Sequence, residues 1–127
     1  MDTKVYVGSF ASYNRYSKRI VPIAISNGIP SWYTGLRYKP LAPTYELVRT
    51  YRNADDCDQK DLKIYISTYI IEVLSKLNAL TVYRELMKMS AGKPVILLSQ
   101  ESSSEFSHRK IVKSWFEKSS IHCEELS

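Results

Sequence analysis

The chain has 127 residues, of which 44% are hydrophobic and 24% are charged, and its formal net charge is +5. This composition excludes a disordered chain and favours one globular domain. No apolar run reaches the roughly 18 residues of a membrane-spanning helix, and the first residues lack the apolar stretch of a secretion signal, so we expect a cytoplasmic protein that does not enter the membrane. Cys57 and Cys123 match neither metal-ligand spacing nor a disulfide framework. We therefore expect no metal and no cofactor.

The first part of the chain predicts two strands, a long loop and a short helix. Apolar runs over residues 4–10 and 19–25 end at glycine or serine, which is typical of strands. Pro22 lacks a backbone N–H, so the second strand should lie at an edge of the sheet or be bulged there. Residues 26–42 are rich in proline, glycine and aromatic residues and predict an ordered loop. Pro43 suits the first turn of a helix, which we expect over residues 43–52.

The middle of the chain predicts two further helices. Asp58 and Asp61 suit a helix N-terminus, and the apolar residues that follow recur at steps of three and four. This spacing indicates a helix that faces the core rather than a partner. The apolar positions are Leu62, Tyr65, Ile66, Tyr69, Ile70, Val73, Leu74 and Leu77. Asn78 should cap the next helix, which continues to Met89, and Gly92 should end it.

Residues 94–98 form a continuous apolar run, which is typical of a strand buried on both faces of a parallel sheet. We expect it to be the central strand, followed by a serine-rich turn and a last helix that begins near Ser104. Residues 119–127 should be a frayed tail. The predicted fold is a single small α/β domain over residues 1–118, with a mostly parallel sheet of few strands and helices on both faces.

Polar and charged side chains follow the predicted central strand. In open α/β sheets, ligands bind beyond the carboxyl ends of the strands, where helix N-termini attract anions. The candidate ligand-binding residues there are Ser99, Glu101, Ser107, His108 and Arg109. Glu101 and His108 are also the candidate catalytic acid or base groups, and Arg109 could bind a phosphate or a carboxylate. Alternatively, Arg109 forms an internal ion pair with Glu101 or Glu72.

Positive charge and tyrosine are concentrated near the start of the chain. Residues 1–52 hold eight basic and two acidic side chains and seven of the ten tyrosines, whereas residues 53–127 hold ten basic and eleven acidic side chains. Basic groups interleaved with aromatic ones can bind single-stranded nucleic acid or a nucleotide, with Tyr6, Trp32 or Tyr33 as stacking surfaces. The same stretch could instead attract anions in general, with its tyrosines packed at the edge of the core.

Four short segments occur in the order and spacing of a known family: LAPT at 41–44, YIIEVL at 69–74, VILLSQE at 95–101 and FSHR at 106–109. From about Val5 to Phe116, the chain resembles the domain of unknown function 488 family, the YeaO-like proteins of bacteria, archaea and phages. The resemblance implies a compact α/β fold and a site near the His-Arg pair, but no established activity. Many relatives carry cysteine at the positions of Ser99 and Ser107, so we expect any thiol chemistry to be lost in this chain.

Three functions are consistent with these patterns. The first is binding of a phosphorylated or nucleotide-like ligand at the end of the central strand. The second is an enzyme that acts on nucleotides or nucleic-acid bases. The third is a small protein-interaction or inhibitor domain, such as a phage makes against a host enzyme, whose basic face contacts a protein partner. The sequence does not decide whether the protein is an enzyme.

Overall fold

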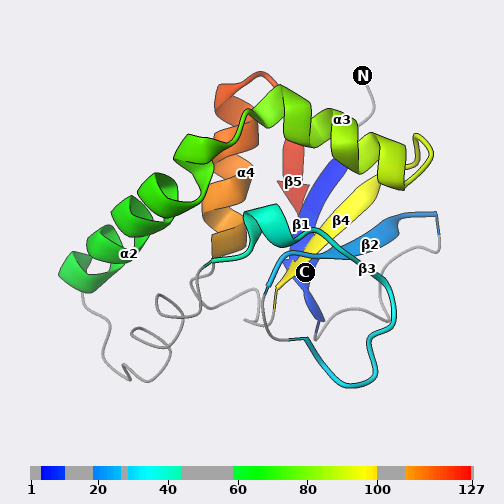
Figure 1. The fold of residues 1–127 in the computed structure, drawn as a ribbon, viewed down its shortest axis with the longest axis horizontal. Helices are drawn as coiled ribbons and strands as arrows, with labels where there is room; N and C mark the ends of the chain where they lie inside the picture. Colours follow the sequence, from blue (N-terminus) through cyan, green and yellow to red (C-terminus); the bar gives the residue numbers. More distant parts are fainter. Residues whose placement is uncertain (1–3, 11–18, 27–28, 44–58, 100–107, 127) are drawn as a thin grey trace.

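The computed structural model describes residues 4–10, 19–26, 29–43, 59–99 and 108–126. Five strands form one sheet in the order β3-β2-β4-β1-β5, and every neighbouring pair is parallel (Figure 1). The strands are β1 (Val5–Ser9), β2 (Val21–Ala24), β3 (Leu36–Arg37), β4 (Val95–Ser99) and β5 (Cys123–Glu125). The helices are α2 (Gln59–Glu72), α3 (Ala79–Met89) and α4 (His108–Lys118), with short 3-10 helices η2 (Lys39–Leu41) and η3 (Leu74–Lys76). The predicted small α/β domain with a parallel sheet is confirmed.

Strand β4 is the central strand, as its apolar run predicts. All five of its residues are buried. It pairs with β1 on one side and with β2 on the other, so that Val95 lies beside both Val5 and Val21. A parallel strand between two neighbours has side chains packed on both faces, which explains why no polar residue interrupts the run before Ser99.

Pro22 lies where a proline removes no hydrogen bond from the sheet. On the side of β2 that faces β4, Val21 N donates to Pro94 O at 2.8 Å and Ile25 N donates to Leu98 O at 3.0 Å. Because successive N–H groups of a strand alternate in direction, the nitrogen of Pro22 faces the β3 side. There β3 pairs only with Ile23 and Ala24. Strand β2 is therefore an edge strand at Pro22, as expected, and an inner strand immediately after it.

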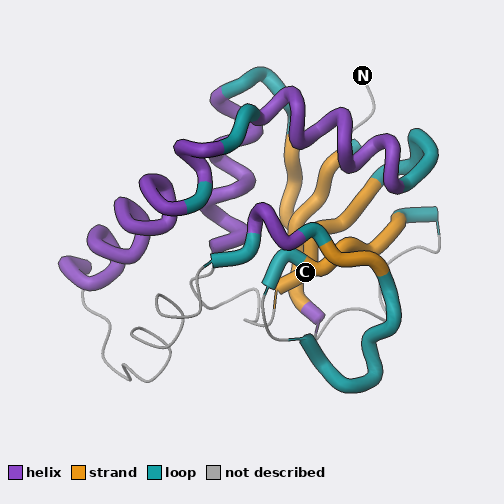
Figure 2. Tube along the Cα trace, viewed as in Figure 1, coloured by secondary structure: helices purple, strands orange, loops and turns teal. Residues whose placement is uncertain are grey.

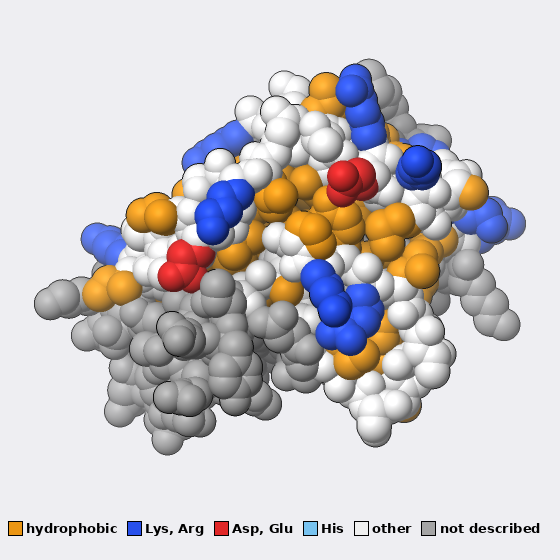
Figure 3. Space-filling model, viewed as in Figure 1, with side chains coloured by type: hydrophobic (Ala, Val, Ile, Leu, Met, Phe, Trp, Pro, Cys, Tyr) orange, Lys and Arg blue, Asp and Glu red, His pale blue; other side chains and the backbone are white. Residues whose placement is uncertain are grey.

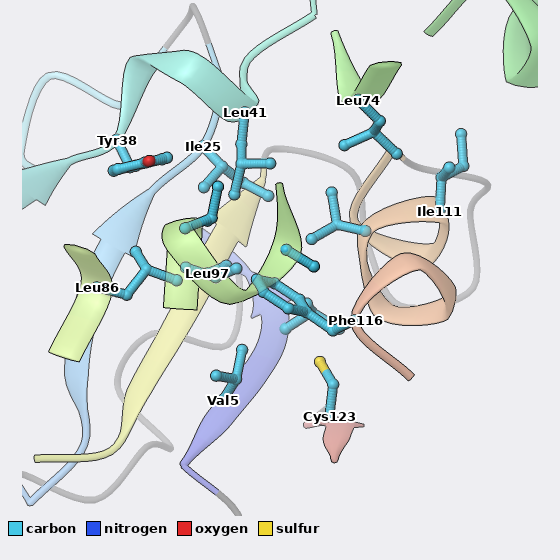
Figure 4. Close-up of a cluster of buried hydrophobic side chains, with 14 of the residues drawn as sticks. Val5, Ile25, Tyr38, Leu41, Leu74, Leu86, Leu97, Ile111, Phe116 and Cys123 are labelled. Carbon is cyan, nitrogen blue, oxygen red and sulfur yellow. The ribbon is translucent and has the colours of Figure 1, made fainter. Parts of the chain in front are cut away.

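The two faces of the sheet are covered differently (Figure 2). On one face, which we call the helical face, alternate strand residues such as Val7 and Leu97 pack against buried residues of α2, α3 and α4. In Figure 4, Phe116 of α4, Val5 of β1 and Cys123 of β5 point into the same space. On the other face, the loop face, a second cluster consists of Phe10, Ala24, Tyr33, Ile96 and Leu98. We expected helices on both faces, but all three described helices contribute to the helical face.

Helix α2 only partly follows the expectation that its apolar residues face the core. Tyr65 and Tyr69 are buried, as is Val73 directly after the helix, whereas Ile70 is 41% exposed. Figure 1 shows the reason, since α2 extends beyond the edge of the sheet. No described helix is both long and apolar enough to cross a membrane.

Helix α3 has the predicted ends. The side chain of Asn78 accepts a hydrogen bond from Thr81 N at 3.1 Å, which caps the helix. At the other end, Gly92 N donates to Met87 O at 2.8 Å, and Ala91 and Gly92 have φ of 56° and 83°. This is the Schellman arrangement, in which the chain turns through left-handed residues directly after a helix.

The frayed tail expected over residues 119–127 is wrong for its middle part. Cys123, Glu124 and Glu125 form β5, which pairs in parallel with β1. The burial of Cys123 within the main core holds this strand in place. The helix expected over residues 43–52, Cys57 and the serine-rich turn after β4 lie outside the described residues.

Candidate functional site

Two serines lie side by side at the carboxyl edge of the sheet. Ser9 ends β1 and Ser99 ends β4, and the two are paired in register. Both are buried, with 2% and 0% exposure. Alternation along the strands places them on the same face as Val7 and Leu97, which is the helical face. Helix α4 begins at this same edge, so its first described turn lies over the ends of β1 and β4.

Arg109 joins α4 to the ends of two strands. Its side chain is fully buried. Its Nη1 donates to Ser99 Oγ at 2.7 Å, and its Nε donates to Glu125 Oε1 at 3.3 Å in an ion pair. The Glu125 side chain is 26% exposed, so this pair links a buried cation to a carboxylate that water reaches. The internal pairing considered for Arg109 is thus present, with Glu125 of β5 as a partner that the sequence did not suggest.

His108 is held against the end of β2. Its ring is 2% exposed, and Nε2 lies 2.8 Å from Ile25 O. A carbonyl oxygen only accepts hydrogen bonds, so Nε2 carries a proton, and in the neutral ring Nδ1 is then the acceptor. The ring also lies 5.6 Å from that of Tyr69 in α2, whose hydroxyl donates to Leu41 O at 2.5 Å. Burial raises the pKa of Tyr69 well above its usual value, which keeps this phenol neutral.

The aromatic candidates lie on the opposite side of the sheet from His108 and Arg109. Tyr33 is buried in the loop-face cluster, where its ring centroid is 5.1 Å from that of Phe10. Its hydroxyl donates to Leu36 O at 2.6 Å. Trp32 is 54% exposed. The structure therefore places the predicted stacking surface at Tyr33 on the other face of the sheet from the His-Arg pair.

Two of the candidate site residues, Glu101 and Ser107, lie outside the described residues. Figure 3 shows the basic side chains of this view spread over the surface, with apolar side chains between them. Among the described residues, no group of three histidine, cysteine or acidic side chains could hold a metal ion. What the site does combine is a buried guanidinium, two buried hydroxyls and an imidazole with a defined proton position, which together suit hydrogen bonding to an anion.

The sequence reasoning missed Ser9 and Glu125. Ser9 carried a usable signal, because it ends the first predicted strand, and parallel strands end at the same edge of a sheet. Glu125 carried none, since it belongs to a three-residue strand in a segment expected to fray.

The comparisons with known proteins give the family. A family model described as DUF488-N3a, the active DUF488-N3 subclade, matches residues 7–120. The chain belongs to the DUF488 family. The match includes Ser9, Ser99, His108 and Arg109, and it ends before Glu125. Neither the curated proteins nor the solved structures gave a match for this DUF488 chain. The loss of family cysteines at Ser99 and Ser107 stays a prediction.

Proposed function

We propose that this DUF488 protein binds a small phosphorylated or nucleotide-like ligand at the carboxyl edge of its sheet. The observation that carries this proposal is the fully buried Arg109, held at that edge by Ser99 and Glu125. Burial of a guanidinium is costly, and apolar residues of similar size stabilise a core at least as well. A charged group kept in such a position is therefore better explained by ligand binding than by stability.

The local chemistry supports an anion as the ligand. Arg109 presents several N–H donors in one plane, a geometry that matches two oxygens of a phosphate. Its bond to Glu125 fixes the plane of the guanidinium before any ligand arrives. A basic side chain near the start of a helix opposes the helix dipole, and a bound anion relieves that repulsion. The hydroxyls of Ser9 and Ser99 lie at the same edge of the sheet.

Thermal-shift measurements test the proposal. The intact protein is heated with inorganic phosphate, sugar phosphates and nucleoside mono- and diphosphates at several salt concentrations. A ligand that binds only the folded state raises Tm. We expect such a rise in the wild type and its loss in Arg109→Lys, which keeps the charge but not the planar fork. Arg84→Lys, on the exposed side of α3, is the matched control and should respond like the wild type.

Two outcomes would remove the proposal. One is the absence of a Tm rise with every compound of the panel. The other is an equal rise in the wild type and in Arg109→Lys, because the ligand would then bind elsewhere. A shift that is present in both variants and disappears at about 0.5 M salt is a case of this second outcome, since it reports general attraction of anions.

An enzyme acting on nucleotides or nucleic-acid bases is the second candidate. It is favoured by the hydrogen bond from His108 Nε2 to Ile25 O, which leaves a lone pair on Nδ1 as an acceptor, and by the match to the active DUF488-N3 subclade. Nucleotides incubated with the protein and separated by chromatography would reveal a product. We expect turnover to be lost in His108→Gln with Tm within a few degrees of the wild type. Binding without any product would leave the protein a binding module.

A further inference from the structure

A hollow of about 430 Å³ lies between α2 and α4, separate from the residues that surround Arg109. Its α2 side consists of Ile66 and Ile70, followed by Leu74 of η3. These residues are four positions apart, so they form one row along the helix and its continuation. We call this hollow the α2–α4 groove.

The opposite wall of the α2–α4 groove belongs to α4. Ile111 and Trp115, four residues apart, supply its apolar part. Lys110, Ser114 and Lys118 form a second row of the same helix along the groove. The groove is thus apolar along its length, and both charged side chains that line it are lysines.

The α2 side of the groove is open to solvent at Ile70, which is 41% exposed. Ile64 and Ile71 are also exposed, at 44% and 67%, but a helix turns about 100° per residue, so they lie on another side of α2 and do not line the groove. Single exposed apolar residues are ordinary, whereas one in a row that lines an apolar groove is typical of an interaction surface.

The apolar rows and the two lysines of the groove indicate which kind of partner it can bind. A groove between two helices with rows at four-residue spacing accommodates a third helix, whose apolar residues at i, i+4 and i+7 fit between the rows. Lys110 and Lys118 are eight residues apart, which is about 12 Å along a helix. They would meet acidic side chains placed about two turns apart on the occupant. We propose that the α2–α4 groove binds an amphipathic helix of a partner protein with an apolar stripe and acidic flanks.

A synthetic peptide tests this proposal with the full chain. The probe is a fluorescein-labelled helical peptide of sixteen residues, with leucine at i, i+4, i+7 and i+11 and glutamate beside this stripe. A peptide of the same composition in scrambled order is its control. We expect fluorescence anisotropy to show saturable binding of the first peptide and at least tenfold weaker binding of the second.

Paired variants locate the binding. Ile70→Glu and Lys118→Glu should each weaken binding at least tenfold, because one places charge in the apolar row and the other reverses a lysine. Ile71→Glu and Lys63→Glu are the matched controls, since both residues are exposed on α2 and neither lines the groove, and they should change affinity less than twofold. A peptide with lysine in place of glutamate should regain affinity for a Lys110→Glu, Lys118→Glu double variant.

Several results would overturn the proposal. Equal binding of the scrambled peptide, or equal effects of Ile70→Glu and Ile71→Glu, would show that the groove does not select a helix. Concentration-dependent dimers that Ile70→Glu abolishes, without peptide binding, would assign the groove to a second copy of the chain. Binding to vesicles of anionic phospholipid in place of the peptide would assign it to a membrane surface. Because Arg109 is unchanged in every variant, the ligand-induced Tm shift separates this test from that of the anion site.

Discussion

The helical face and the loop face of the sheet are built from the same strands but are covered by different elements and side chains. Strand β4 places the fully buried Leu97 on the first and the fully buried Leu98 on the second. The helical face combines three helices with a polar edge at Arg109, whereas the described part of the loop face is covered by aromatic and aliphatic side chains. In the described residues, the buried guanidinium of Arg109 therefore belongs to the helical face. Of the tyrosines near the start of the chain, Tyr33 packs on the loop face and Tyr38 on the helical face.

The largest expected difference between the faces concerns their core leucines. Leu97→Ala should lower the free energy of unfolding by about 3–5 kcal/mol, because the surrounding helices cannot close the cavity. Leu98→Ala should cost about 2–3 kcal/mol, since the loop that covers it can move inward. Denaturant unfolding of both variants measures the difference. An equal or larger cost for Leu98→Ala would mean that the loop face is as rigid as the helical face.

The next effect concerns the carboxylate that pairs with Arg109. Glu125→Gln should lower stability by about 1–3 kcal/mol, because the buried guanidinium loses its negative partner, although the partial exposure of Glu125 reduces this cost. Glu124→Gln, one residue earlier and 52% exposed, is the control and should stay within about 0.5 kcal/mol. Thermal unfolding of both variants at low salt is the measurement. Similar small costs in the two would show that Arg109 does not depend on β5.

Removing one tyrosine hydroxyl from each face compares how much the hydrogen bonds of the two faces stabilise the protein. Tyr69→Phe on the helical face should cost about 1–2 kcal/mol, because it leaves the buried Leu41 carbonyl without its donor. Tyr33→Phe should cost about 0.5–1 kcal/mol, since Leu36 is 41% exposed and water can replace the hydroxyl at its carbonyl. Urea unfolding of each variant gives both values. The reverse order would contradict the view that the loop face is closer to solvent.

The smallest effect is a loss of stability at alkaline pH. Burial raises the pKa of the Cys123 thiol to about 12, above its ordinary value of 9.0, so the folded state holds this proton more tightly than the unfolded state. Stability should therefore be constant below about pH 9 and fall as pH rises toward 12. At pH 9.5 the ionisation of Cys123 should have lowered the free energy of unfolding by about 1 kcal/mol or less. In unfolding measurements at increasing pH, the free energy of unfolding of Cys123→Ala should fall less steeply than that of the wild type. Part of the fall should remain, because the pKa values of Tyr38 and Tyr69 are raised as well.

The elements that could be predicted from the sequence are those with a strong local signal. The apolar run of β4 predicts a buried central strand, and Asn78 and Gly92 predict the ends of α3, because these features depend on neighbouring residues only. The position of the His-Arg pair followed from a general rule about where parallel strands end.

The unpredicted features depend on tertiary structure. A strand of three residues such as β5 has too few positions to show a period, so the partner of Arg109 could not be found. The side of the sheet on which Tyr33 packs is set by the path of a loop, which composition does not reveal. The exposure of Ile70 results from α2 extending beyond the sheet, although the spacing of its apolar residues is that of a core helix.

The position of β4 in the sheet has a consequence for how the protein folds. Strands β1 and β2 are early in the chain, yet each pairs with β4, about 70 to 90 residues later, and β4 lies between them. Until β4 joins the sheet, β1 and β2 therefore have no strand to link them, and their apolar residues have no continuous surface to cover. Such long-range parallel pairing slows folding, because a large loop must close before any contact stabilises it. A fragment ending before Val95 should consequently lack both strand pairs that join β1 to β2 through β4, whatever helices it retains.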